Sequence, residues 1–293
     1  MNDIILEHDI YNDEGVLILS KGSQVELTQE MRLKLSRIGV LEELLQPKET
    51  KEISDKEKLC LSKIPTSDTS CNMTVYEKAK NYIVDFSKKY HKVDTYVFQQ
   101  AHTVLDNLIY NSQDMQWHRH LLIIMNYVDW LYAHSINTAL ISCIIGTKLN
   151  YTGDKLKDLA LGAILHDIGL VLLPTEILNK TIELTDVEMT IMKNHCELGY
   201  KMMQNIELSE KSKNIILQHH EKNDGSGYPK GLCLNDICEE SRIVIIAEYF
   251  DTATTQRPYK HARCVNSVLN EMKLRPDLYD ASIVDILCEN IGE

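Results

Sequence analysis

Basic residues are scarce in this chain of 293 residues. It contains 31 Lys and Arg against 43 Asp and Glu, which gives a formal net charge of -12. Proteins that bind duplex nucleic acid neutralise its phosphates with a basic face, so this balance argues against such a partner. A small anionic ligand stays compatible with the chain if metal ions or a few local cations supply positive charge.

Long apolar runs are also missing. The most apolar segments, TALISCIIG and LALGAILHDIGLVLLP, are interrupted by polar residues before they reach the length of a membrane span. MNDIILEHDI has neither the basic region nor the apolar stretch of a signal peptide. The eight cysteines lack the dense spacing of a secreted disulfide scaffold. We therefore expect a cytoplasmic protein with reduced thiols and no membrane partner.

Proline is absent between residues 66 and 173, and apolar residues recur there at every third or fourth position. This periodicity is typical of helices, and it predicts a mainly α protein whose helical domain spans residues 73–293. Residues 1–46 differ, because DIYNDEGVLILSKGSQVELT predicts short strands and TQEMRLKLSRIGV predicts one helix. Residues 47–72 are polar and charged, which favours a linker between this small strand-and-helix module and the helical domain.

Two local signals fix boundaries inside the helical domain. Thr185 and Glu188 form a capping-box pattern that predicts the start of a helix carrying His195. By contrast, NDGSGYPKG contains three glycines and a proline, so it predicts a loop.

Two adjacent histidines stand just before that loop, and the chain supplies partners for them. A single histidine on a helix is more often a satisfied or exposed residue than a ligand. Here five histidines and two acids occur on separate predicted helices, each flanked by apolar residues that would turn it inward. These residues are His134, His166, Asp167, His195, His219, His220 and Glu248.

Imidazole and carboxylate together suit divalent ions such as iron and manganese. A carboxylate placed like Asp167 can bridge two ions about 3.5–4 Å apart, and a metal-bound hydroxide can then attack phosphorus. The set therefore predicts a dinuclear centre for phosphoester hydrolysis.

HSINT at 134, LHDIG at 165, the His195 helix, HHEKNDGSGYP and RPYK at 257 resemble the successive motifs of the HD-GYP family. This is the bacterial branch of the HD phosphohydrolases that hydrolyses cyclic di-GMP. The resemblance runs in order from His134 to Lys260. It implies an all-helical HD-type domain and a phosphodiesterase that opens cyclic di-GMP to linear pGpG, with further cleavage to GMP left open.

The resemblance also implies roles for single residues. The first metal would be held by His134, His166, Asp167 and Glu248, and the second by His195, His219, His220 and the shared Asp167. His166 and Asp167 would be the catalytic pair. Substrate would be contacted by Arg257 and Lys260, which match phosphate-binding positions, and by the signature loop with Gly225, Gly227 and Tyr228. For the glycines, a turn that only shapes the wall of the cavity is an equal alternative.

Three positions depart from the family pattern. Leu170 stands where the family has a lysine, Glu248 stands where it usually has an aspartate, and Trp130 replaces the acid that members with three metals carry. The first change removes a cation from the site, and the third favours two metal ions. We therefore expect a slow enzyme.

Two alternatives remain open at this point. The chain could be a weak or inactive receptor for a cyclic dinucleotide, which Leu170 favours, or a hydrolase of another cyclic dinucleotide or phosphoester. A homodimer is compatible with its apolar helices. Outside the set of ligands, we expect Trp117, His118 and His120 to be exposed and Cys196 to serve packing. Asp251 would brace the site without binding metal.

Overall fold

The structure is a computed structural model, and it describes residues 69–180, 182–256 and 261–292, together with four short strands that precede them. It divides into two compact units. One comprises Met1–Ser67 and Leu172–Asn179, and the other comprises Asp68–Val171 and Lys180–Glu293.

The first unit contains the strands. β1 (Asp3–Ile5) pairs antiparallel with β4 (Gln24–Glu26), and β2 (Ile10–Tyr11) pairs antiparallel with β3 (Leu17–Leu19). The short helix α8 (Thr175–Leu178) also belongs to this unit. The strands expected within residues 1–46 are therefore confirmed. The helix expected at TQEMRLKLSRIGV and the linker lie outside the described residues, so the domain boundaries remain a prediction.

The second unit is helical, as the sequence predicts, and the one β feature in its described part is an isolated bridge between Asp224 and Cys233. Its elements are α3 (Thr69–Lys89), α4 (Thr95–Tyr110), α5 (His118–Tyr127), α6 (Asp129–Lys148), α7 (Gly153–Leu165), the 3₁₀ helix η2 (Ile168–Leu172), α9 (Asp186–Lys193), α10 (His195–Met203), α11 (Glu210–Gln218), α12 (Glu239–Thr254), α13 (Val265–Lys273) and α14 (Ala281–Ile291). η2 ends at the border between the two units.

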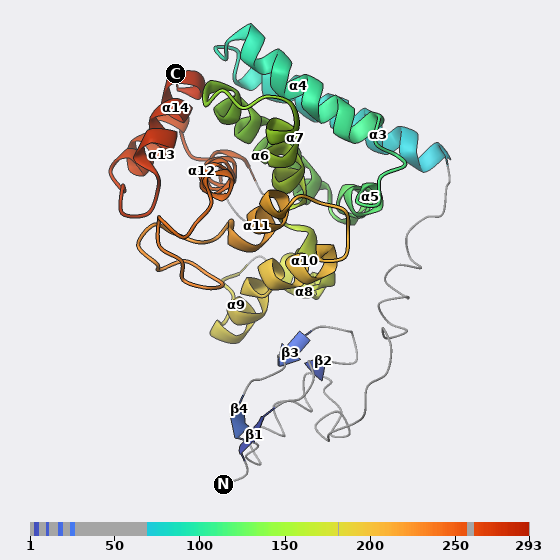
Figure 1. Cartoon of the computed structure of the whole chain (residues 1–293), viewed down its shortest axis with the longest axis vertical. Helices are drawn as coiled ribbons and strands as arrows, with labels where there is room; N and C mark the ends of the chain where they lie inside the picture. The colour runs from blue at the N-terminus through green and yellow to red at the C-terminus, as the bar shows by residue number, and fades with distance from the viewer. Residues whose placement is uncertain are drawn as a thin grey trace. The chain divides into compact units, whose positions relative to one another are not determined.

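Helix α6 lies at the centre of this unit. It packs against α7, α12 and α4, while α11 packs against α7, α10 and α12. Figure 1 shows α3, α4 and α5 along one side of α6 and α7, with α13 and α14 grouped beside α12. Apolar side chains cover α6 on nearly all sides, as expected for a helix buried in a core. Several of its polar residues, including His134 and Thr138, are buried among them, where a polar partner inside the fold stabilises them.

The capping box at Thr185 is confirmed, because its hydroxyl accepts from the Glu188 backbone N–H and the Glu188 carboxylate accepts from the Thr185 N–H. The helix that starts there does not carry His195, however. It ends at Lys193, and Asn194 separates it from α10, whose first residue is His195.

A second expectation is wrong as well. Trp117, His118 and His120 are buried, not exposed, with 1%, 4% and 4% of their surfaces accessible. They lie at the start of α5, where the His118 Nε2 atom meets the Tyr76 hydroxyl of α3 at 3.4 Å. The covering helix is more than forty residues away in the sequence, so no local pattern could indicate their burial.

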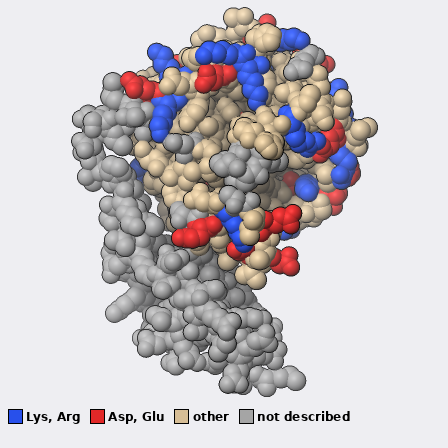
Figure 2. Space-filling model, turned by 180° about the vertical axis from the view of Figure 1, so that it is seen from behind, with Lys and Arg blue, Asp and Glu red and all other residues tan. Residues whose placement is uncertain are grey.

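On the face shown in Figure 2, acidic and basic side chains of the described residues lie among one another. In the part of the chain that the structure describes, every helix is too short or too polar to cross a membrane.

Candidate metal centre

The ends of four segments and the first half of α6 bring the candidate ligands together. His166 directly follows α7, Asp167 lies between α7 and η2, His195 opens α10, and His219 and His220 directly follow α11. Helix α6 supplies His134. Ligand atoms gather in two groups, each with all members within 4.8 Å of one another. One group is His134, His166 and Asp167, and the other is Asp167, His195, His219 and His220. Asp167 belongs to both.

Four of the imidazoles are anchored through the Nδ1 atom. His134 Nδ1 meets Asp251 Oδ2 at 2.7 Å, and His166 Nδ1 meets the Ala163 carbonyl at 2.7 Å. His195 and His219 meet backbone carbonyls in the same way, at 2.7 and 3.0 Å. A carbonyl or carboxylate only accepts, so each Nδ1 carries the proton and each Nε2 is left with a free lone pair. Metal-binding histidines are commonly oriented by such partners.

The free Nε2 atoms converge on the Asp167 carboxylate. His166 and His134 lie 3.2 and 3.8 Å from Oδ2, while His195 and His219 lie 3.3 and 3.6 Å from Oδ1. The Nε2 atoms of His195 and His219 are only 3.0 Å apart. Two lone pairs at this separation repel unless a proton or another cation lies between them.

His166 provides the test of fit for a metal ion. Its side chain is fully buried, and its Nε2 atom has no hydrogen-bond partner. A buried polar atom without a partner costs free energy, and a divalent ion would satisfy it. The donor set of imidazoles and one carboxylate is that of iron, manganese and zinc sites. The residues therefore fit divalent metal binding.

Electrostatics prepare three of these groups for ligation. Burial alone would raise the pKa of Asp167, but the imidazoles of His166, His195 and His219 hold this pKa well below its usual value. Burial also lowers the pKa of His166 and the pKa of His220. Asp167 is therefore ionised and these two imidazoles are neutral at pH 7, which are the forms that bind metal.

The glycine-rich loop forms one wall of the site. The Tyr228 ring stacks on the His220 ring at 4.7 Å, and the Lys193 ammonium lies 5.3 Å from the centre of the Tyr228 ring. Burial raises the pKa of Tyr228, so its hydroxyl remains a donor. Gly227 is needed for close packing, because a Cβ atom there would lie 2.4 Å from the Glu221 Cα. Gly225 adopts a positive φ of 79°, so it serves the turn.

Glu221 anchors this loop, a role that the sequence did not reveal. Its buried carboxylate accepts the backbone N–H groups of Lys230 at 2.8 Å and of Leu232 at 2.9 Å. Glu221 directly follows His219 and His220 in the sequence. The residue that holds the loop is therefore covalently linked to two candidate ligands, and the loop packs beside them. The sequence signal that could have indicated this role is the position of Glu221, an acid just before a glycine-rich turn.

Helix α12 contributes Asp251 to the site as the hydrogen-bond partner of His134, whereas the sequence predicts Glu248 of the same helix as a metal ligand. Asp251 is 1% exposed and holds His134, and its other oxygen accepts from Asn137 and Thr255. This matches the expected bracing role. Glu248 lies outside both groups of ligand atoms and accepts a hydrogen bond from the Thr252 hydroxyl at 3.0 Å. Ligation by Glu248 therefore stays a prediction.

Other expected residues have different outcomes. Leu170 is 5% exposed and brings an apolar side chain into η2 where the family pattern has a lysine. Arg257 and Lys260 lie outside the described residues. Cys196, which the sequence predicts to serve packing, lies beside two candidate ligands. Its Sγ atom lies 3.5 Å from His195 Nε2 and 3.9 Å from His219 Nε2.

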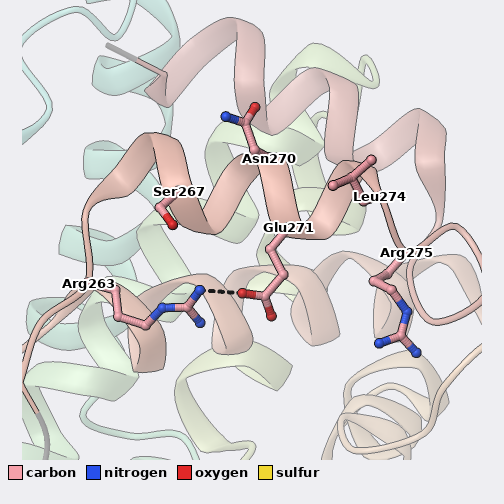
Figure 3. Close-up of a pocket in the computed structure, with 6 residues that line it drawn as sticks. All are labelled: Arg263, Ser267, Asn270, Glu271, Leu274 and Arg275. Carbon is pink, nitrogen blue, oxygen red and sulfur yellow. Dashed lines mark hydrogen bonds and ion pairs between the residues drawn. The ribbon is translucent and has the colours of Figure 1, made fainter.

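A separate open groove of about 720 Å³ lies along α13. Figure 3 shows Arg263 and Glu271 pointing toward one another in an ion pair across it. Its second arginine, Arg275, is paired with Asp277. None of the candidate metal ligands lines this groove, and both of its cations are already neutralised.

Comparison with known proteins adds independent findings. A family model described as HD domain matches residues 121–283, more than half of the chain. The cyclic di-GMP phosphodiesterase response regulator RpfG of Xanthomonas campestris pv. campestris is 35% identical over 147 residues, which cover 49% of this chain and 39% of that protein. A cyclic di-GMP phosphodiesterase of Thermotoga maritima is 32% identical over 182 residues, which cover 61% of this chain and 46% of that protein.

Among solved structures, Bd1817, a HDG"Y"P protein from Bdellovibrio bacteriovorus, matches with a TM-score of 0.50 at 18% identity. The match covers 99% of this chain and 95% of that one. This likeness supports the fold. The aligned part of this chain spans less than half the length of either curated relative.

Proposed function

The chain belongs to the HD domain family, and on that premise we propose that it is a metal-dependent phosphodiesterase that hydrolyses cyclic di-GMP to linear pGpG. The observation that carries the proposal is the convergence of four Nε2 lone pairs on the two oxygens of Asp167. Two relatives that are 35% and 32% identical are named cyclic di-GMP phosphodiesterases, which supports the choice of substrate. Cleavage on to GMP is the second step that this activity would allow.

The proposed centre holds two divalent ions. His134, His166 and Asp167 would hold the first, with Glu248 as a further ligand, and His195, His219, His220 and Asp167 would hold the second. Such ions supply Lewis acidity and lower the pKa of water bound to them. The chain's own contribution is orientation, because Asp251 and three backbone carbonyls fix the Nδ1 atoms before any ion arrives. Iron or manganese suits these nitrogen and oxygen ligands.

Substrate phosphate would be held by cations beside this centre. We assign that role to Arg257 and Lys260, while Gly225, Gly227 and Tyr228 would form the wall against which the dinucleotide lies. The ammonium of Lys193, which lies over the Tyr228 ring, adds a positive charge on the same side. It would offset part of the charge lost with the family lysine at Leu170.

A receptor without turnover is the second candidate. The buried, apolar Leu170 favours it, because loss of one positioned donor costs on the order of 10²–10³ in rate. A hydrolase of another cyclic dinucleotide or phosphoester is the third candidate. The His166 Nε2 atom, which is buried without a hydrogen-bond partner, favours a metal-loaded site in all three candidates.

The decisive measurement is hydrolysis of cyclic di-GMP by protein loaded anaerobically with iron or manganese, with the products separated by chromatography. We expect slow formation of pGpG, loss of product in His166→Ala and a faster reaction in Leu170→Lys. His102→Ala, which changes a histidine paired with Asp106 on α4, is the control and should keep the wild-type rate.

Tight binding of cyclic di-GMP without product, after metal loading, would replace the enzyme with the receptor. Product from another cyclic dinucleotide alone would keep the chemistry and change the substrate. A cytoplasmic location and a homodimer remain predictions that fractionation and light scattering would check.

A further inference from the structure

Cys196 lies beside two members of the second group of ligands, His195 and His219, and the proposed phosphodiesterase gives it no role. It follows His195 at the start of α10 and is fully buried. Its Sγ atom contacts the Nε2 atoms of two candidate ligands at once, His195 at 3.5 Å and His219 at 3.9 Å. A cysteine that only filled space in the core would contact carbon atoms, not two lone pairs.

The three separations match those of ligands around one ion. Zinc-like ions bind nitrogen at about 2.0–2.1 Å and sulfur at about 2.3 Å, so a tetrahedral arrangement places sulfur and nitrogen about 3.5–3.6 Å apart. The sulfur–nitrogen distances are 3.5 and 3.9 Å, and the two nitrogens are 3.0 Å apart. One position in the described structure therefore lies within bonding reach of all three atoms.

A second observation indicates that the centre to which this cluster belongs takes a cation. His166 Nε2, which is fully buried and unpartnered, faces Oδ2 of the same Asp167 whose Oδ1 faces His195 and His219. Nδ1 of His195 and Nδ1 of His219 are both bonded to backbone carbonyls. In the neutral imidazoles the two Nε2 lone pairs therefore face one another, and a cation between them would relieve their contact.

The geometry points to Cys196 as a thiolate ligand of the ion in the second half of the centre, an inference that rests on the proposed metal centre. As the Sγ–metal bond forms, the thiol releases its proton to solvent and no redox change occurs. The two halves of the centre then differ. The first is built from nitrogen and oxygen, whereas the second contains one soft sulfur, which favours iron, cobalt or zinc over manganese.

The test is the absorption spectrum of the whole 293-residue chain loaded with Co²⁺. A thiolate bound to Co²⁺ gives a sulfur-to-metal charge-transfer band in the near ultraviolet, which imidazole and carboxylate do not. We expect this band in the wild-type protein and its loss in Cys196→Ser, which keeps the shape of the side chain. Cys196→Ala should lose it too, so the result does not depend on how well serine packs.

Cys143→Ser is the matched control. Cys143 is also fully buried, on α6, and it is absent from both groups of candidate ligands, so the band should remain. Chelator competition gives a second readout. Removing a group that only braces a ligand lowers metal affinity by about 10–100-fold, and loss of a direct ligand should lower the affinity of one Co²⁺ at least that much.

The possible failures are distinguishable. A protein that binds two Co²⁺ ions and hydrolyses cyclic di-GMP without showing the band would overturn the thiolate ligand and leave the proposed function intact. A band that survives in Cys196→Ser would also overturn the thiolate ligand. So would a fall in Co²⁺ affinity in Cys196→Ser when the wild-type protein shows no band. A protein that binds no ion would overturn both proposals.

Discussion

Single residues outside the ligand set determine which nitrogen faces the candidate centre. Three of the anchored imidazoles use a neutral backbone carbonyl, and only His134 uses a carboxylate, that of Asp251. Burial would raise the pKa of Asp251, but the hydrogen bond from His134 and its charge lower it. Asp251 therefore remains an anion beside His134, and it makes that imidazole a stronger donor to a metal ion.

We expect Asp251→Asn to weaken binding of the first ion by about 10–100-fold, because partners of this kind contribute that much to metal affinity. The amide keeps the size of the side chain but loses the charge, and it can present N–H to His134 Nδ1. Titration of the apoprotein with Mn²⁺ against a chelator measures the change. Thr255→Val, which removes only a hydroxyl that donates to Asp251, should change affinity far less. Equal affinity in Asp251→Asn and wild type would show that Asp251 has no part in orienting His134.

At the scale of elements, the site depends on how closely η2 approaches α10. Gly169 in η2 lies against the backbone of α10, and a Cβ atom there would be 2.0 Å from the His195 carbonyl oxygen and 2.7 Å from the Gly199 amide nitrogen. Backbone atoms cannot rotate away as side chains do. The glycine of the HDIG segment thus places Asp167, two residues before it, beside His195.

Gly169→Ala should therefore destabilise the fold by about 3 kcal/mol, the upper part of the range for overpacked sites. It should also weaken metal binding, since η2 and α10 must separate. Urea unfolding and the Mn²⁺ titration measure the two effects. Gly146→Ala is the control, because its new Cβ would meet side-chain atoms and not backbone, the nearest being Leu159 Cδ2 at 2.7 Å and Leu156 Cδ1 at 3.1 Å. A loss of stability no larger in Gly169→Ala than in Gly146→Ala would contradict the close approach.

At the scale of the whole molecule, the sequence predicts most of what depends on local pattern. Apolar periodicity predicts the helical unit, and glycine with proline predicts the loop, because both act within a few residues. Six of the seven candidate ligands do come together. Each of the six is a polar residue at a position where core packing alone would favour an apolar side chain.

The features that the sequence does not predict depend on contacts between segments that are distant in the chain. Glu248 and Asp251 are three residues apart on α12, so only the rotation of the buried helix decides which of them reaches His134. The burial of His118 and His120 depends on packing of α5 within the unit, which a local pattern does not contain. The break at Asn194 lies in a stretch whose composition alone continues a helix. It places His195 at the first turn of α10, with Cys196 beside it.

One of these buried histidines makes the stability of the protein depend on pH. Burial, with the nearby Arg119, lowers the pKa of His120 from 6.5 to about 4. Below pH 6.5 the unfolded chain takes up a proton that the folded chain refuses, so stability falls as the pH drops from 6.5 to 4. The difference of about 2.5 pKa units corresponds to about 3 kcal/mol. This stability is fully present above pH 6.5.

His120→Gln removes the titrating group, so the variant should lose about 3 kcal/mol less than the wild type over this interval. The measurement is urea unfolding of metal-free protein at a series of pH values between 7 and 4, with the free energy of unfolding plotted against pH. Because both proteins keep the candidate ligands, the titration of those histidines cancels in the difference. Ile124→Val, a fully buried neighbour on α5, is the control. It should lower stability by about 0.5–1.5 kcal/mol at every pH without changing the slope. Parallel curves for His120→Gln and wild type would mean that His120 is protonated in the folded protein as readily as in the unfolded chain.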